Sequence, residues 1–124
     1  MSLDVLLVED NELNRDMLSR RLARAGYSVR VAPDGQQALE AMRDKTPDVV
    51  LLDMNLPVKD GWTTCREARE DPALAATRII ALTAHAMGED KQRAMDAGCD
   101  DYATKPVDFP ELLNKIQRLV DQKS

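Results

Sequence analysis

Strand and helix patterns alternate along the whole chain, and this alternation is the feature that most constrains its fold. Two short runs, residues 6–8 and 49–52, are apolar at every position, which is typical of strands buried on both faces. Each run is followed by a helical pattern. Because a strand, a crossover helix and the next strand form a right-handed parallel unit, the five strands and five helices predict one parallel sheet covered on both faces.

The boundaries follow from capping, turn and stop residues. We expect strands over 3–8, 28–32, 48–53, 78–83 and 101–104. We expect helices over 11–25, from the turn at 33–35 to about 45, over 62–70, over about 89–97, and after a cap at Asp108. In the first helix, Leu13, Met17, Leu18 and Leu22 are predicted to share one apolar side. Five strands suit the flavodoxin-like order 2-1-3-4-5, so we expect an α/β doubly wound domain over residues 1–124.

Composition excludes several classes of function. The net charge of −5 argues against direct binding to nucleic acid or to an anionic membrane surface. The chain has no run of 18 apolar residues and no secretory signal, so we expect a cytoplasmic protein without membrane insertion. Cys65 and Cys99 form no CxxC pair and have no histidine at zinc-site spacing. They are interpreted as buried small residues of a reduced protein.

Three acidic residues follow the two apolar strands. Glu9 and Asp10 come directly after the first strand, and Asp53 ends the third. These strands are neighbours in the order 2-1-3-4-5, and their carboxyl ends flank the crevice at the switch point. Like charges gathered there repel one another, and a divalent cation with oxygen ligands would hold them together. The turn at 9–11 has no glycine, which disfavours a flavin or nucleotide phosphate and favours Mg²⁺.

Simpler interpretations of the same residues stay open. Asp10 or Asn11 could serve only as the cap of the first helix, and Asp53 could cap a turn. Thr83 and Lys105 follow the fourth and fifth strands, and each alone would be a turn or loop residue. Together at one sheet edge, a hydroxyl, an ammonium, a metal and a carboxylate suit phosphoryl transfer, with Asp53 as the nucleophile that forms an aspartyl phosphate.

These stretches resemble the receiver domain of two-component response regulators over nearly the whole chain. The matching segments are residues 7–11, residues 53–57 with Asp60 and Gly61, residues 80–84, and residues 101–106. The resemblance implies that Asp53 accepts the phosphoryl group. It implies that Asp10, Asp53 and the backbone carbonyl of Asn55 bind Mg²⁺, with Glu9 acting through a water. It further implies that Thr83 is the switch hydroxyl, Lys105 the cationic partner of the phosphoryl group, Lys105–Pro106 a cis peptide bond, and Tyr102 the aromatic switch residue.

The resemblance also implies a signalling function rather than an enzyme. Phosphoryl transfer from a histidine kinase or a histidine phosphotransfer protein would change the face formed by the fourth helix, fifth strand and fifth helix, and would be reversed by slow autodephosphorylation. We therefore expect a downstream protein target and a monomer or weak homodimer, either stand-alone or part of a hybrid kinase. The apolar positions of the fourth helix are Met87, Ala94, Met95 and Ala97, with no Leu, Ile, Val or Phe. Little large apolar area anchors this helix, so it should move most easily.

Two other functions remain as alternatives. A small Mg²⁺-dependent phosphatase could use the same aspartate nucleophile, but such chemistry needs a second carboxyl group two residues later as general acid, where this chain has Asn55. A flavodoxin-like cofactor carrier is disfavoured by the acidic first loop.

Overall fold

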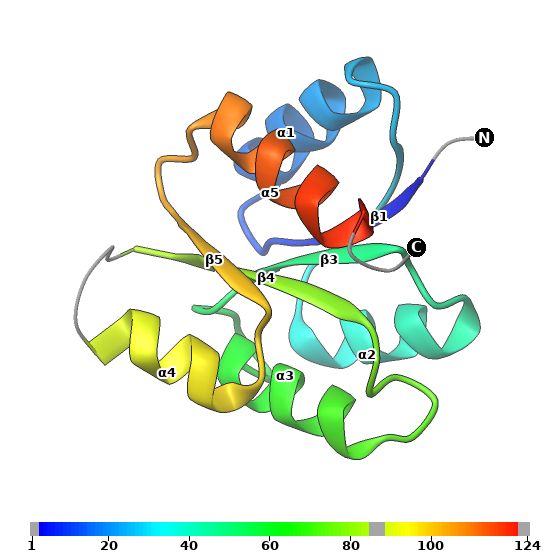
Figure 1. Ribbon diagram of the computed structural model, residues 1–124, viewed down its shortest axis with the longest axis vertical. Helices are drawn as coiled ribbons and strands as arrows, with labels where there is room; N and C mark the ends of the chain where they lie inside the picture. Colours follow the sequence, from blue (N-terminus) through cyan, green and yellow to red (C-terminus); the bar gives the residue numbers. More distant parts are fainter. Residues whose placement is uncertain (1–2, 85–88, 122–124) are drawn as a thin grey trace.

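The computed structural model describes residues 3–84 and 89–121. Its five strands form one parallel sheet in the order β2-β1-β3-β4-β5, which confirms the predicted topology (Figure 1). The elements are β1 Asp4–Val8, α1 Glu12–Arg24, β2 Ser28–Ala32, α2 Gly35–Asp44, β3 Val49–Asp53, α3 Gly61–Glu70, β4 Arg78–Thr83, α4 Glu89–Ala97, β5 Asp101–Thr104 and α5 Phe109–Asp121.

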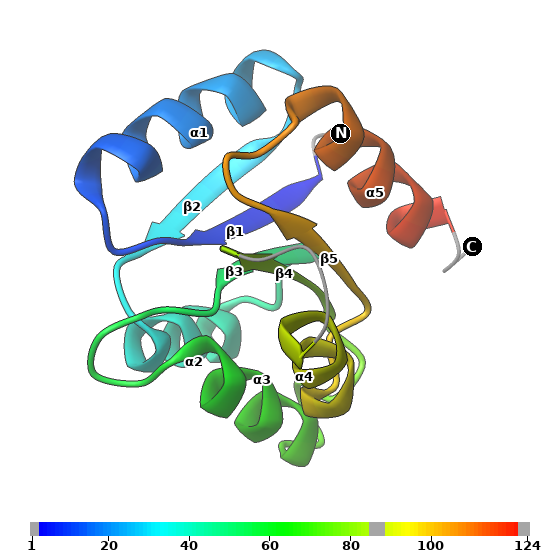
Figure 2. The same cartoon turned by 90° about the vertical axis from the view of Figure 1, so that its left-hand side faces the viewer.

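The sheet lies between two layers of helices. Helices α1 and α5 cover one face, and α2, α3 and α4 cover the other (Figures 1 and 2). Every residue of β1 and β3 is buried, as the apolar runs 6–8 and 49–52 within them predict. Alternate side chains of each strand therefore enter two separate cores, one containing Leu22 and Ile116 and the other containing Leu39 and Trp62.

The predicted apolar side of α1 is only half correct. Leu18 and Leu22 are buried, but 81% of Leu13 and 54% of Met17 is exposed. Successive helical residues are rotated by about 100°, so residues 13 and 17 lie on a row beside the 18 and 22 row. The structure therefore buries the row that contains Leu18 and Leu22, and it leaves the row that contains Leu13 and Met17 uncovered.

Local signals set the helix boundaries. Asn11, Asp34 and Asp60 cap α1, α2 and α3, each accepting a hydrogen bond from the backbone N–H three residues later. Gly26 and Gly98 end α1 and α4 with φ of 102° and 105°, a conformation that favours glycine. The predicted cap of α5 is also confirmed, since Asp108 Oδ1 accepts from the Glu111 N–H at 3.2 Å.

Helix α4 is anchored by small side chains, as predicted. Ala94 and Ala97 are buried, whereas 43% of Met95 is exposed. Met87, which the sequence analysis also assigned to this helix, lies outside the described residues. Among the helices that the structure describes, none is both long and apolar enough to cross a membrane.

Candidate functional site

Three carboxylates converge at the carboxyl ends of β1 and β3. The two strands pair in register, with Val8 opposite Leu52, so Glu9 and Asp10 follow β1 beside Asp53, the last residue of β3. One carboxylate oxygen from each of Glu9, Asp10 and Asp53 lies within 4.8 Å of the other two. Glu9 and Asp53 are buried and Asp10 is exposed, so the cluster opens to solvent on the Asp10 side.

Both oxygens of Asp53 have hydrogen-bond donors. Oδ1 accepts from the Asn55 N–H at 3.0 Å, and Oδ2 accepts from Lys105 Nζ at 2.8 Å. The same ammonium lies 3.8 Å from Glu9 Oε1. Lys105 is placed by its own backbone, whose N–H donates to the Thr83 carbonyl at 2.7 Å. One ammonium therefore faces three carboxylates, which leaves the cluster with excess negative charge.

This environment shifts the pKa of the Glu9 carboxyl group. Burial raises its pKa from 4.5 to about 7, and the nearby Asp53 adds to the rise, although the Asn11 N–H and Lys105 act in the opposite direction. A cluster of carboxylate oxygens with excess negative charge, buried on the Glu9 and Asp53 side and open at Asp10, fits a hard divalent cation such as Mg²⁺. A bound cation would favour ionised Glu9 because an opposite charge lowers a carboxyl pKa.

The loop from β3 to α3 folds directly onto the phosphoacceptor candidate. The Gly61 N–H donates to the Met54 carbonyl at 3.0 Å. A Cβ at Gly61 would lie 2.5 Å from the Asp53 carbonyl oxygen and 2.6 Å from Met54 Cα, which are backbone atoms that cannot move aside cheaply. Glycine is required at this position because the start of α3 touches the backbone of Asp53.

Comparison with known proteins agrees with this geometry. The family model of the response regulator receiver domain matches residues 5–117. The chain belongs to the response regulator receiver domain family. It is 36% identical to the DNA-binding dual master transcriptional regulator RpaA of Synechocystis sp., over 94% of this receiver domain and 48% of that protein. The receiver domain thus spans about half the length of this relative.

Two solved structures resemble this receiver domain closely. One is the receiver domain of the sensor histidine kinase PA1611 from Pseudomonas aeruginosa, with a magnesium ion in its active-site cleft; it has a TM-score of 0.90, 36% identity, and 98% and 99% coverage of the two chains. The other is a receiver domain of the Saccharomyces cerevisiae response regulator Ssk1 in complex with the histidine phosphotransfer protein Ypd1. Its TM-score is 0.90, with 30% identity and 98% and 91% coverage.

The structure brings together most of the residues that the sequence singled out for this receiver domain. Glu9, Asp10, Asp53 and Lys105 form one cluster, and the Lys105–Pro106 bond is cis. Thr83 is buried at the end of β4, next to β3, in which Asp53 pairs with Leu82. The simpler interpretations also hold: Asn11 caps α1, and Asp53 accepts a turn hydrogen bond from Asn55. Capping and cluster formation are compatible.

Sequence reasoning missed three residues that contact the carboxylate cluster or Tyr102. Arg15 of α1 donates from Nη1 to the Glu9 carbonyl at 3.1 Å and fixes the backbone beside the cluster. Lys91 of α4 and Lys115 of α5 place their Nζ atoms 5.3 and 5.1 Å from the centre of the half-buried Tyr102 ring. Both distances suit cation–π contacts, which tie the ring to the two helices. No sequence spacing marks such contacts, because the residues come from different elements.

Proposed function

We propose that this receiver domain accepts a phosphoryl group on Asp53 from a phosphohistidine of a histidine kinase or a histidine phosphotransfer protein. The observation that carries the proposal is the Asp53 carboxylate, which is buried, bound by Lys105 and the Asn55 N–H, and surrounded by further oxygen ligands. The magnesium ion of the PA1611 receiver and the phosphotransfer partner of the Ssk1 receiver support it.

In the proposed transfer, one Asp53 oxygen forms a bond to phosphorus while the bond from phosphorus to the donor histidine nitrogen breaks. Asp10, Asp53 and the carbonyl of Asn55 would hold Mg²⁺, with Glu9 acting through a water, and the ion would neutralise charge on the phosphoryl oxygens. Lys105 Nζ is already 2.8 Å from Asp53 and supplies further positive charge. Such positioning and neutralisation are the main sources of catalysis in phosphoryl transfer.

Incubation with acetyl phosphate and Mg²⁺, followed by intact mass measurement, tests the transfer. We expect a gain of one phosphoryl group, about 80 Da, that Asp53→Asn abolishes. Asp44→Asn is the matched control, because Asp44 is an exposed aspartate at the end of α2. A phosphoryl gain that persists in Asp53→Asn would contradict the assignment.

We further propose that Thr83 and Tyr102 carry the signal from the phosphoryl group to the face formed by α4, β5 and α5. The Thr83 hydroxyl would donate a hydrogen bond to the phosphoryl group, and Tyr102 would follow by turning inward. The weak anchoring of α4 by alanines supports this, since an element with little buried apolar area moves at low cost. A changed face would alter binding to a downstream protein.

Amide NMR with a beryllofluoride phosphate mimic tests the switch. We expect shifts to extend from Asp53 through Thr83 to the described part of α4 and to Tyr102. Thr83→Ala should confine the shifts to the metal cluster. Wild-type shifts that stop at the cluster would overturn the switch while leaving the phosphoacceptor proposal intact.

A further inference from the structure

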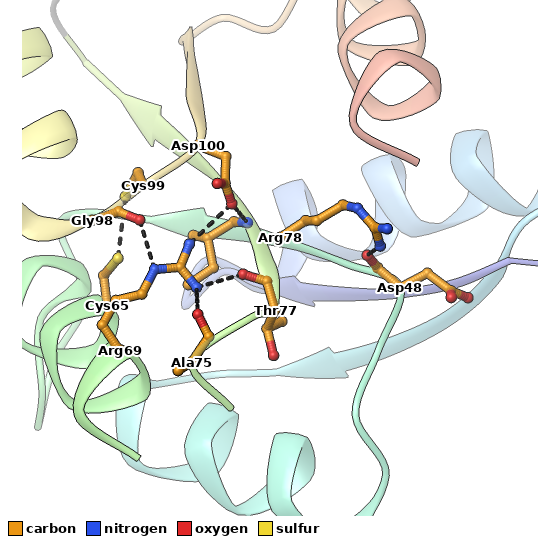
Figure 3. A network of polar contacts seen from close by, with 10 residues as sticks. Asp48, Cys65, Arg69, Ala75, Thr77, Arg78, Gly98, Cys99 and Asp100 are labelled. Carbon is orange, nitrogen blue, oxygen red and sulfur yellow. Dashed lines mark hydrogen bonds and ion pairs between the residues drawn. The ribbon is translucent and has the colours of Figure 1, made fainter. Parts of the chain in front are cut away.

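Two buried thiols from distant parts of the chain lie side by side. Cys65 of α3 and Cys99, which follows α4, are 34 residues apart, yet their Sγ atoms are 3.5 Å apart (Figure 3). Both are free cysteines, with exposures of 0% and 4%. We infer that this pair is a modification site: a reversible disulfide that joins α3 to the end of α4 when the protein meets a peroxide.

The backbone on the Cys99 side is held firmly. The Gly98 N–H donates to the Met95 carbonyl and the Cys99 N–H to the Ala94 carbonyl, both at 3.0 Å, which is the Schellman pattern of a helix end. This pattern fixes the direction in which Cys99 leaves α4. The backbone that carries the Cys99 side chain is therefore fixed by the helix end and not by a loop of variable conformation.

Arg69, one turn after Cys65 on α3, locks the same junction (Figure 3). Its Nε donates to the Gly98 carbonyl at 2.8 Å, and its Nη2 lies 2.9 Å from Asp100 Oδ2. Its Nη1 donates to the carbonyls of Ala75 and Thr77 before β4. One guanidinium thus joins the residues on both sides of Cys99 to the helix that carries Cys65.

Little movement separates the thiols from a covalent bond. A disulfide bond is about 2.05 Å long, so the sulfur atoms must approach by about 1.5 Å. The Cys99 thiol donates to the Cys65 sulfur, and this hydrogen bond lowers the pKa of Cys65, helped by the positive charge of Arg69. Burial acts in the opposite direction. The first attack is assigned to Cys65.

The chemistry balances with a peroxide as the oxidant. Cys65 first releases its thiol proton. The thiolate attacks one oxygen of hydrogen peroxide, the O–O bond breaks, and the leaving hydroxide combines with the released proton as water. The Cys99 sulfur then attacks the resulting sulfenic sulfur, the S–O bond breaks, and the second hydroxide leaves with the Cys99 proton as water. Two thiols lose two electrons and one peroxide becomes two waters.

Access to the buried pair depends on α4. The buried side chains in the described part of α4 are the small Ala94 and Ala97, so the body of the helix can move at low cost and admit the peroxide while Arg69 holds its C-terminal end at Gly98. The finished disulfide would then tie the end of α4 to α3. Its regulatory consequence rests on the proposed switch: an oxidised receiver should still accept phosphoryl at Asp53 but should transmit less of the change through α4.

The covalent bond is tested without any phosphoryl chemistry. The native chain is treated with hydrogen peroxide, alkylated in denaturant and digested without reductant. We expect one linked peptide pair containing Cys65 and Cys99, and its loss after dithiothreitol. Cys65→Ala and Cys99→Ala should each prevent it. If the wild-type cysteines stay fully alkylable, or oxidise singly to sulfinic acid without a linked pair, the inference is wrong.

The regulatory consequence has a separate measurement. We compare the beryllofluoride-induced amide shifts of α4 in the reduced and the peroxide-treated wild-type protein. We expect the shifts of α4 residues 91–97 to fall at least about twofold on oxidation, while those of residues near Asp53 persist. Unchanged α4 shifts in the linked protein would overturn the regulatory part. Absent shifts in the reduced protein would instead count against the proposed switch.

Discussion

Asp10 is the one exposed carboxylate in the cluster of Glu9, Asp10 and Asp53. Its effects on stability and on cation binding can therefore be measured without disturbing the buried carboxylates. Glu9 and Asp53 are buried, and Asp53 is bound by Lys105 and Asn55. Asp10 adds negative charge within 4.8 Å of both but is free to face water. Its charge therefore opposes folding through repulsion while favouring a bound cation, and one substitution should show both effects.

We expect Asp10→Asn to raise the free energy of unfolding by about 1 kcal/mol in the absence of Mg²⁺, because one repulsive charge is removed. The same variant should lose most of the stabilisation that added Mg²⁺ gives to the wild type. Urea titrations with EDTA and with Mg²⁺ measure both effects. Asp16→Asn, on the exposed face of α1, serves as control; equal stabilisation of both variants by Mg²⁺ would contradict the metal assignment.

The backbone of Val58 is strained by the turn in which this residue lies. Its φ is 66°, which is unfavourable for a β-branched residue, and 84% of it is exposed. The turn brings the Lys59 N–H to the Pro57 carbonyl at 2.6 Å. We expect Val58→Gly to raise the free energy of unfolding by about 1 kcal/mol, since glycine adopts a positive φ without the steric cost of a β-branched side chain and no buried contact is lost. Thermal denaturation measures this; a lower melting temperature would refute it.

At the scale of elements, the contact between α3 and the end of β3 matters most for the site. Gly61 lets the first turn of α3 touch the backbone of Asp53, and Gly35 similarly brings the start of α2 against the β3–α3 loop. These contacts place the loop that carries Asn55 beside the carboxylates. The Asp53 carboxylate is thus held by a strand end, a helix start and Lys105 of a third segment.

We expect Gly61→Ala to lower the free energy of unfolding by about 1–3 kcal/mol, because its Cβ must displace backbone. It should also slow phosphorylation of Asp53 by acetyl phosphate, since the displaced atoms include the Asp53 carbonyl. Gly26→Ala is the matched control: its φ of 102° strains alanine, but nothing lies within 4 Å of the new Cβ. The Gly26→Ala variant should lose stability but should be phosphorylated at the same rate as the wild type.

At the scale of the whole molecule, one sheet joins two cores. Ile116 of α5 is buried on one face and Leu39 of α2 on the other, with 0% and 1% exposure. Because both cores share the same five strands, neither helix layer has a sheet of its own to fold on. The receiver domain should therefore unfold as one cooperative unit.

We expect Ile116→Ala and Leu39→Ala each to lower the free energy of unfolding by about 2–5 kcal/mol through cavity formation. Each should keep a single transition, with fluorescence and circular dichroism midpoints that coincide. Leu13→Ala is the control, because this leucine is 81% exposed and should change stability little. Separate transitions for the two probes would show that the layers unfold independently.

The order of strands and helices, and the meeting of the acidic residues with Lys105, were predictable from sequence for a physical reason. Burial on both faces leaves unbroken apolar runs, and the carboxyl ends of parallel strands share one edge, so Glu9, Asp10, Asp53 and Lys105 had to meet. Only the tertiary structure decided which row of α1 is covered, that Cys65 lies against Cys99, and that Lys91 and Lys115 flank Tyr102. Local periodicity encodes the type of each element, whereas these contacts depend on how helices pack across the sheet, which no short stretch of sequence records.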